Sequence, residues 1–285
     1  MQYLITGANG YLGKYLQEEL TVRGIPYLAA GRVEFDLSRI EEIDAYFSQH
    51  DITHVIHLAG AVGSDKGEAL YQANIAGLYN ILSVCATHSV KYFLYASGNV
   101  VYGPQGSTPH RESDVLAPNT ADLYAVSKYV GELIVEKFCL QHNMQYALVR
   151  IGDIYGPKQR TGNLIKAIVN SVATSQPLKL YGIGIRARDY IYVTDVANGL
   201  ATIAEKEFTG AINLGSGVGT TVKQLIEIAQ QISNGVCGIE HVPVEEEDTS
   251  NITLDTQMIC DLDFSPKVSI YDGLLKCIME QANDE

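Results

Sequence analysis

Short apolar runs of strand length alternate along the first half of the chain with stretches whose apolar residues recur at helical spacing. The strand-like runs are Tyr3–Ile5, Tyr27–Ala30, His54–Leu58, Tyr92–Ala96 and Tyr146–Arg150. The helix-like stretches between them include Arg39–His50, Tyr71–His88 and Tyr124–His142. Such alternation is typical of a parallel sheet with helices on both faces, so we expect a doubly wound α/β fold.

The pattern changes after about residue 155. Glycine and proline become frequent and the strand-like runs shorten, to Pro177–Tyr181, Tyr190–Val193 and Ala211–Leu214. Helical patterns recur at Asn163–Ala173, Val196–Ala204 and Val222–Ile232. We therefore expect a larger domain over residues 1–155 and a smaller C-terminal α/β lobe over residues 156–285, interleaved with the first.

The first strand leads directly into a glycine turn, Gly7, Gly10 and Gly13, followed by an amphipathic helix. This order presents free backbone N–H groups and a helix N-terminus to a phosphate. Three glycines alone also fit a turn that only packs a helix on a strand. The second strand at βαβ distance favours a dinucleotide site, with contacts from Gly7, Asn9, Gly10, Tyr11, Leu12 and Gly13.

The end of the second strand indicates which dinucleotide binds. A carboxylate there accepts from the ribose 2′-OH of NAD, whereas arginine accommodates the 2′-phosphate of NADP. The strand ends at Ala30-Gly31-Arg32, without a carboxylate. We expect NADP(H) to be preferred and NAD(H) to be possible. Further contacts are expected from Asp36 and Leu37 near the adenine, and from Leu58, Ala59 and Gly60 after the third strand.

Tyr124 and Lys128 are the candidate reacting pair, because residues four apart share a helix face. A nearby ammonium favours the phenolate, so we expect Lys128 to lower the pKa of Tyr124. The phenol is then a plausible proton donor or acceptor at a carbonyl or carbinol oxygen. Lys128 is also expected to contact the nicotinamide ribose. The motif is common by chance, and its position after the fourth strand makes it informative.

Taken together, these motifs resemble extended short-chain dehydrogenases/reductases of the nucleotide-sugar epimerase/dehydratase family. The matching segments are Thr6–Gly13, His57–Gly60, Asn74–Gly77, Val101–Gly103, Tyr124-x-x-x-Lys128, Ile154–Pro157, Arg188–Val196 and Asn213–Gly217. The resemblance implies a Rossmann-type domain that binds NAD(P), a lobe that binds a nucleotide sugar, and a cofactor contact from Asn74. It also implies a homodimer through the helices at Tyr71–His88 and Tyr124–His142.

One departure from the family pattern affects the catalytic hydroxyl. The family usually places Ser or Thr four residues before the tyrosine of Val-Tyr-Gly, and here that residue is Gly98. Ser97 is one residue early, and in a strand it would point to the opposite face. Asn99, Ser97 after a local bend, or a water could supply the missing hydrogen bond; otherwise the activity is weakened or altered. Loss of one such donor typically costs a factor of about 10² to 10³.

A second departure lies in the expected substrate lobe. Asp153 stands where many relatives have asparagine near the substrate diphosphate, and a carboxylate there would repel that group unless it is turned away. Arg188 matches the family's cation for the diphosphate, and Arg186 is a second candidate for this contact.

The residues around Gly98 reduce the number of family reactions that this chain is expected to catalyse. Asn99 and Val100 replace the acid pair of the dehydratases and the glutamate of the decarboxylases, and the Cys and His of GDP-fucose synthases are missing. The compact Arg32–Leu37 segment resembles NADP-dependent 4-ketosugar reductases. We expect reduction of a 4-keto-6-deoxy nucleotide sugar. The alternatives are a UDP-sugar 4-epimerase and a non-catalytic NAD(P)H-binding protein.

Composition sets the remaining expectations. The 285-residue chain has a net charge of −13, which argues against nucleic-acid and anionic-membrane partners. No apolar run approaches the roughly 20 residues of a membrane span, and no signal peptide is evident. The five cysteines form no Cys-x-x-Cys, so we expect neither a metal site nor a disulfide framework. A reducing cytoplasm fits best.

Overall fold

A sheet of six parallel strands forms the centre of the larger lobe, in the order β2-β1-β3-β4-β5-β9. Its strands are β1 (Tyr3–Thr6), β2 (Tyr27–Ala30), β3 (His54–His57), β4 (Tyr92–Gly98), β5 (Gln145–Ile151) and β9 (Gly210–Leu214). The structure, a computed structural model, describes residues 1–62, 67–104, 108–159 and 164–283. The predicted doubly wound α/β fold is confirmed.

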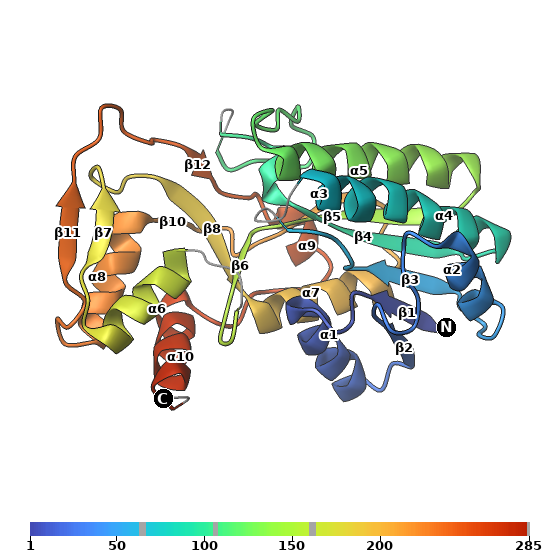
Figure 1. Ribbon diagram of the computed structural model, residues 1–285, viewed down its shortest axis with the longest axis horizontal. Helices are drawn as coiled ribbons and strands as arrows, with labels where there is room; N and C mark the ends of the chain where they lie inside the picture. The colour runs from blue at the N-terminus through green and yellow to red at the C-terminus, as the bar shows by residue number, and fades with distance from the viewer. Residues whose placement is uncertain (63–66, 105–107, 160–163, 284–285) are drawn as a thin grey trace.

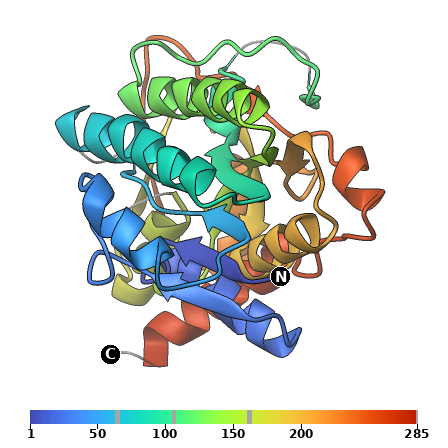
Figure 2. The ribbon, with the colours of Figure 1, turned by 90° about the vertical axis from the view of Figure 1, so that its right-hand side faces the viewer.

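Helices cover both faces of this sheet (Figures 1 and 2). On one face α1 (Tyr11–Val22) packs against α7 (Val193–Glu205), and their core includes Leu16 and Leu200. The other face carries α2 (Ile40–Phe47), α4 (Leu78–Thr87) and α5 (Leu123–Gln141) over a second core. The apolar side chains of the central strands alternate between these two cores, as the pleat of a strand requires.

The predicted helix at Tyr71–His88 is present as part of one unbroken helical run that includes a π-helical segment. It consists of α3 (Gly67–Tyr71), a π-helical segment η1 (Gln72–Gly77) and α4. A π-helical turn is wider than an α-helical turn and often marks a functional site. Gly77 lies so close to Leu37 that an added Cβ would stand 2.9 Å from the Leu37 Cβ. At this point the helix packs closely against the segment that follows β2.

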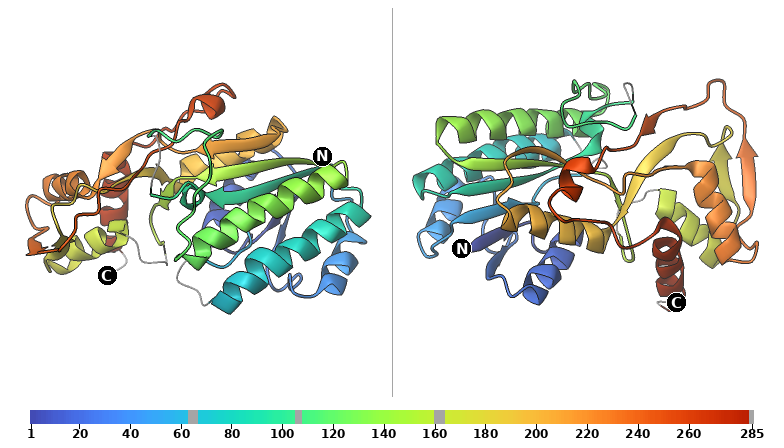
Figure 3. Two further views of the ribbon diagram at one scale, coloured as in Figure 1. Left: turned by 90° about the horizontal axis from the view of Figure 1, so that it is seen from above. Right: turned by 180° about the vertical axis from the view of Figure 1, so that it is seen from behind.

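In the described residues, two short sheets and the helices α6, α8 and α10 form the smaller lobe, which lies beside the larger one (Figures 1 and 3). One sheet has the order β10-β8-β12, with β6 also paired to β8, and the other joins β11 to β7. The elements are β6 (Asp153–Tyr155), β7 (Leu178–Tyr181), β8 (Ala187–Tyr192), β10 (Gly219–Thr221), β11 (Ile239–Val242), β12 (Asn251–Ile252), α6 (Leu164–Thr174), α8 (Val222–Ile232) and α10 (Ile270–Asn283). A capping box of Thr221 and Gln224 fixes the start of α8.

Between β8 and β10 the chain leaves the smaller lobe for the larger one and then returns. After β8 the chain enters α7 and β9, which pack on and complete the large sheet, and it then returns to β10. A short η2 (Asn99–Val101) follows β4, and α9 (Gln257–Cys260) contacts β9. Among the described residues, no helix is both long and apolar enough to cross a bilayer.

The strand order reverses between β1 and β3. β1 pairs with β2 on one side and with β3 on the other, and the chain continues outward in both directions. In open α/β sheets, ligands bind beyond the carboxyl ends of the strands at such a switch point. Gly7, at φ +68°, follows β1 there, and an added Cβ would stand 2.7 Å from the Ala59 nitrogen after β3. Only glycine permits this close approach.

Candidate active site

The glycine turn forms a cradle of backbone at the switch point. Gly10 caps α1 without any side-chain hydrogen bond, so the helix N-terminus is left to backbone groups. A Cβ on Gly13 would overlap the Gly7 carbonyl oxygen, which explains the third glycine. These features fit a pyrophosphate, because N–H groups at a helix start attract an anion and the glycines let the backbone approach it closely. The Tyr11 hydroxyl is buried without a hydrogen-bond partner in the described part of the chain.

The end of β2 carries a carboxylate, contrary to the expectation from the sequence. The Gly31 N–H donates to Glu34 Oε2 at 2.6 Å, and a Cβ on Gly31 would overlap the Asn9 amide nitrogen. The turn after β2 therefore brings Glu34 back to the glycine cradle. Arg32 is exposed on the same turn. Both a cation and a carboxylate thus flank the position where an adenosine ribose would lie.

Asp36 and Leu37 lie just beyond this turn. One carboxylate oxygen of Asp36 accepts from the backbone and the hydroxyl of Ser38, both at 2.8 Å, and these bonds lower the pKa of Asp36. The Leu37 carbonyl accepts from Asn80 at 2.8 Å. The adenine contacts expected of this segment stay a prediction, and the Asp36 carboxylate already accepts hydrogen bonds from Ser38 in its own turn.

Asn74 connects three parts of the site. Its amide exchanges hydrogen bonds with the backbone of Ala61, at 2.8 and 3.1 Å, and donates to Ser127 Oγ at 2.9 Å. A Cβ on Gly60 would stand 2.9 Å from Asn74 Oδ1 and 3.9 Å from Lys128 Nζ. The π-helical segment thus fixes the loop Leu58–Gly60 against the N-terminal part of α5.

Lys128 is a buried cation on α5. Its Nζ donates to the Ala96 carbonyl at 2.8 Å and lies 5.1 Å from the centre of the Tyr95 ring. Burial lowers the pKa of Lys128 to about 8, against the opposing effect of Glu132. The ammonium therefore donates to the Ala96 carbonyl and lies near the rings of Tyr95 and Tyr124.

The pKa of Tyr124 moves in the direction opposite to the one expected. Burial first, and then the charges of Asp122 and Asp153, raise its pKa to about 12. Lys128 Nζ lies 5.8 Å from the centre of the Tyr124 ring, so the cation faces the ring. The expected lowering is wrong for the protein without ligands. Asp122 caps α5 by accepting from the Tyr124 N–H at 2.9 Å, which brings this carboxylate close to the phenol's helix turn.

Ser97 does not replace the hydroxyl missing at Gly98. Its Oγ donates to buried Glu132 Oε1 at 2.6 Å, and Glu132 pairs with Arg150 at 2.9 Å. The strand continues without a bend that would bring Ser97 to the other face, so the catalytic role considered for it is not supported. At Gly98 itself an added Cβ would meet only ordinary contacts, 3.7 Å to Val100 and 3.9 Å to the Ile151 carbonyl. The site has room for a side chain there.

Asn99 and Asp153 form a pair beside this open position. Asn99 is buried, and its Nδ2 donates to Asp153 Oδ1 at 3.0 Å. Burial raises the pKa of Asp153, while Asn99, Arg188 and Arg186 lower it by smaller amounts. The Asp153 carboxylate therefore accepts from the Asn99 amide at the carboxyl ends of β4 and β5, and the charges of Arg188 and Arg186 favour its ionised form.

The two candidate substrate arginines lie next to an acidic and hydroxyl-bearing segment. Arg188 donates to the Ala187 carbonyl at 2.8 Å and to Ser250 Oγ at 3.0 Å. Arg186 lies 3.9 Å from Asp248. The charges of both arginines act on Asp153. Their side chains already interact with other residues of the protein, Arg188 with Ala187 and Ser250 and Arg186 with Asp248.

Two family motifs serve the scaffold. Asp189 is fully buried and accepts from the backbone of Ser216, Gly217 and Leu254, which ties β8 to the loop after β9. Tyr102 accepts from Arg150 and donates to Asn213 at 2.7 Å. The buried Glu132–Arg150 pair and Glu34 were missed from sequence, because no local pattern distinguishes them from surface charges.

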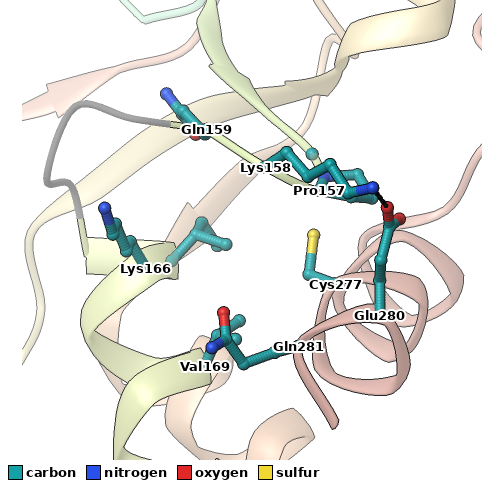
Figure 4. Close-up of a pocket in the computed structure, with 10 residues that line it drawn as sticks. Pro157, Lys158, Gln159, Lys166, Val169, Cys277, Glu280 and Gln281 are labelled. Carbon is teal, nitrogen blue, oxygen red and sulfur yellow. Dashed lines mark ion pairs between the residues drawn. The ribbon is translucent and has the colours of Figure 1, made fainter. Parts of the chain in front are cut away.

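A cavity of about 250 Å³ lies away from these residues (Figure 4). It is enclosed by α6, α10 and the segment after β6, and Lys158 pairs with Glu280 at its rim at 3.0 Å. Burial raises the pKa of Cys277, whose thiol faces the cavity, to about 12. A protonated thiol is a poor nucleophile. Since Tyr124 and Lys128 do not line this cavity, the sheet edge is the better candidate site.

A model of the NAD dependent epimerase/dehydratase family matches residues 3–215. The chain belongs to this family. It is 28% identical over 316 residues to dTDP-4-dehydro-6-deoxyglucose reductase of Escherichia coli, covering 96% of both chains. It is 26% identical over 309 residues to UDP-glucuronate 4-epimerase of Thermodesulfobacterium geofontis, covering 97% of this chain and 94% of that protein.

Solved structures agree with the fold. The structure of MoeE5 in complex with UDP-glucuronic acid and NAD matches with a TM-score of 0.87 at 21% identity, covering 100% of both chains. The predicted family is confirmed, and its members include nucleotide-sugar epimerases, dehydratases and reductases. The preference for NADP(H) expected from Arg32 has no support in this comparison, because that structure holds NAD.

Proposed function

We propose that the protein transfers a hydride between NAD(P)(H) and a sugar carbon of a nucleotide sugar, and that its reaction is reduction of a 4-keto-6-deoxy nucleotide sugar. The observation that carries the proposal is the placement of Tyr124 and Lys128 beside the loop after β3, one strand from the glycine cradle. An idle buried ammonium would be costly to retain. Similarity to the E. coli reductase supports the direction of the reaction.

The residues divide the work between binding and proton transfer. With its pyrophosphate at the glycine cradle, the reduced dinucleotide would supply the hydride from its nicotinamide, beside Tyr124 and Lys128. Tyr124, protonated at neutral pH, donates the proton that the sugar oxygen gains. Lys128 orients the nicotinamide ribose, and Arg188 with Arg186 binds the substrate diphosphate. The α1 N-terminus and Leu58–Gly60 hold the rest of the dinucleotide.

We infer that both dinucleotides bind. Arg32 would contact the 2′-phosphate of NADP, and Glu34 would accept from the 2′-OH of NAD. The NAD bound in the MoeE5 structure supports the second mode.

The test is turnover with defined substrates. The purified protein is mixed with NADPH or NADH and with dTDP- or GDP-linked 4-keto-6-deoxy sugars, and cofactor oxidation is followed by absorbance. Stoichiometric oxidation, with a reduced sugar as product, supports the reductase. If cofactor binds and no 4-keto sugar is reduced, the reductase proposal fails.

A UDP-sugar 4-epimerase is the second candidate, and Glu34 is the observation that favours it. An epimerase returns the hydride to the same sugar and benefits from retained NAD. Tightly bound NAD that co-purifies, together with interconversion of UDP-glucose and UDP-galactose without net cofactor change, would support this candidate over the reductase.

The third candidate function is non-catalytic binding of NAD(P)H, because Gly98 stands where the family has its catalytic hydroxyl. Because the position has room for a side chain, Gly98→Ser should restore the family's hydroxyl without a clash. If neither wild type nor Gly98→Ser converts any of these sugars while both bind NADH, the binding role is supported.

We also propose a homodimer through the outer face of α4 and α5. Tyr79 and Leu133 are 55% and 41% exposed there, whereas Leu78 and Ile81 are core residues and cannot form the interface. Light scattering on wild type and Leu133→Glu tests this. Free, mostly buried cysteines support a reducing, cytoplasmic location.

A further inference from the structure

The open position at Gly98 lies beside a polar pair that the glycine itself does not explain. Gly98 ends β4, Asn99 begins η2, and Asp153 begins β6. The register places Gly98 opposite Ile151, two residues before Asp153. The amide and the carboxylate therefore lie together at the carboxyl ends of β4 and β5. Asp153 is close enough to Tyr124 for its charge to act on that phenol.

We propose that Asp153 is a positioning residue: it fixes the Asn99 amide so that the second Nδ2–H donates to the reacting sugar oxygen, replacing the hydroxyl absent at Gly98. This inference rests on the proposed hydride transfer. An asparagine amide has two N–H donors, and Asp153 occupies one of them at 3.0 Å. A carboxylate accepts only, so it excludes the flipped amide, in which Oδ1 would face Asp153.

Burial makes this orientation firm. Asn99 is 4% exposed, so its amide cannot exchange Asp153 freely for water. Hydrogen bonds to an ionised group are about twice as strong as neutral ones. Asp153 also acts on Tyr124, because its charge contributes to the raised pKa of that phenol. The amide held by Asp153 therefore lies in the neighbourhood of the proton donor.

The charge of Asp153 has a second consequence for the substrate. Arg188 and Arg186 both act on its carboxyl, and Tyr190 and Tyr124 are the titratable phenols that face it from β8 and α5. The two cations offset the repulsion that the carboxylate would exert on a diphosphate. The residue that appeared unfavourable in sequence is thus compatible with the proposed substrate class.

The experiment is a double-mutant cycle with Asp153→Asn and Gly98→Ser, measured as kcat and KM for the 4-keto sugar. Asparagine at 153 accepts or donates, so it no longer selects one orientation of the Asn99 amide. We expect Asp153→Asn alone to lower kcat by about 10-fold, less than the roughly 10² lost with a whole donor. In the Gly98→Ser background the serine hydroxyl donates instead, and the same substitution should change kcat less than about 3-fold.

The matched control is Asp122→Asn. It removes another carboxylate that raises the pKa of Tyr124 and retains a good helix cap. Since Asp122 does not touch Asn99, its effect on kcat should be the same with glycine or serine at position 98. NADH binding and the unfolding midpoint of each variant separate misfolding from mispositioning.

The acid side of the pH profile is an independent readout. Protonation of Asp153 removes the ionic acceptor, so wild-type kcat should fall on acidification with an apparent pKa above that of an ordinary carboxyl. Asp153→Asn should lack this limb. Tyr124 stays protonated throughout this range.

Two outcomes overturn the inference while the proposed function stands. In one, Asp153→Asn leaves kcat unchanged and lowers KM, so the carboxylate only repels the diphosphate. In the other, kcat falls equally in both backgrounds, so Asp153 does not act through a donor at this oxygen. Wild-type protein that binds NADH and sugar without turnover would instead show that the proposed function itself is wrong.

Discussion

Lys128 lies over the ring of Tyr124, one helical turn away on α5, with its ammonium 5.8 Å from the ring centre. The same ammonium donates to the Ala96 carbonyl at 2.8 Å. The pair therefore shares a helix face without a direct bond from the cation to the phenolic oxygen. In this arrangement the phenol remains a proton donor at neutral pH, which suits reduction of a ketone better than oxidation of an alcohol.

Tyr124→Phe removes the proposed proton donor and leaves the ring in place. We expect kcat for the 4-keto sugar to fall by about 10² to 10⁴, the usual contribution of general acid catalysis. NADH affinity, measured by fluorescence, should stay within about 3-fold because the ring contact is kept. Tyr129→Phe, on the same helix, is the control and should retain turnover. Equal rates for Tyr124→Phe and wild type would exclude Tyr124 as the donor.

Lys128→Met should alter the pH dependence of stability. The pKa of Lys128 is depressed from 10.5 to about 8 on folding, so the unfolded chain binds more protons between these values and wild-type stability rises with pH there. The cost of the buried charge is fully present below pH 8. Between pH 7 and pH 10 the wild type should gain about 2 kcal/mol relative to the methionine variant.

Urea unfolding of both proteins at the two pH values measures this difference. The methionine variant also loses the hydrogen bond to the Ala96 carbonyl. This loss lowers its free energy of unfolding by the same amount at both pH values, so it does not affect the comparison. A pH-independent gap would mean that the ammonium is not desolvated in the fold.

Ser97→Ala tests the buried network instead of the chemistry. The Glu132 carboxylate loses a hydrogen bond at 2.6 Å in a dry environment, so the free energy of unfolding should fall by about 1–3 kcal/mol. kcat should be unchanged, because the hydroxyl points to Glu132. Gly98→Ser is the neighbouring comparison and should change kcat without this loss of stability. A large fall in kcat for a stably folded Ser97→Ala would return Ser97 to the catalytic site.

The sequence predicted the fold from features that are local. Apolar runs and helical spacing located the strands of the large sheet, and the glycine turn located the switch point between β1 and β3. The π-helical segment η1 was missed, because the apolar spacing of Tyr71–His88 does not distinguish it from a regular α-helix. We assigned the strand Ala211–Leu214 to the smaller lobe. In the structure it is β9, which pairs with β5 as the last strand of the large sheet.

The candidate site was predicted less completely. Spacing put Tyr124 and Lys128 on one face, but it could not show that the ammonium faces a ring and a carbonyl. Nor could it show that burial, and then the charges of Asp122 and Asp153, raise the pKa of the phenol. The partner of Asp153 is Asn99, 54 residues away, and no sequence spacing indicates that bond. The choice of sugar is expected to depend on the loops Ser64–Gly67, Gln105–Thr120 and Lys158–Asn163, which carry no recognisable motif and lie partly outside the described residues.

Cofactor choice should depend on Glu34 and Arg32 in opposite ways. Glu34 returns to Gly31 at 2.6 Å beside the glycine cradle, where its charge would accept from a ribose 2′-OH and repel a 2′-phosphate. Glu34→Gln should therefore raise the affinity for NADPH relative to NADH by about 10-fold, the equivalent of about 1.4 kcal/mol. Arg32→Gln should weaken NADPH binding by a similar factor and leave NADH binding nearly unchanged, since a 2′-phosphate is the group that the guanidinium recognises. Dissociation constants from nucleotide fluorescence at fixed ionic strength measure both ratios, and Arg39→Gln, on the surface at the start of α2, controls for a general loss of positive charge. If the NADPH-to-NADH ratio is the same in all three variants and the wild type, the adenosine ribose does not lie at the end of β2.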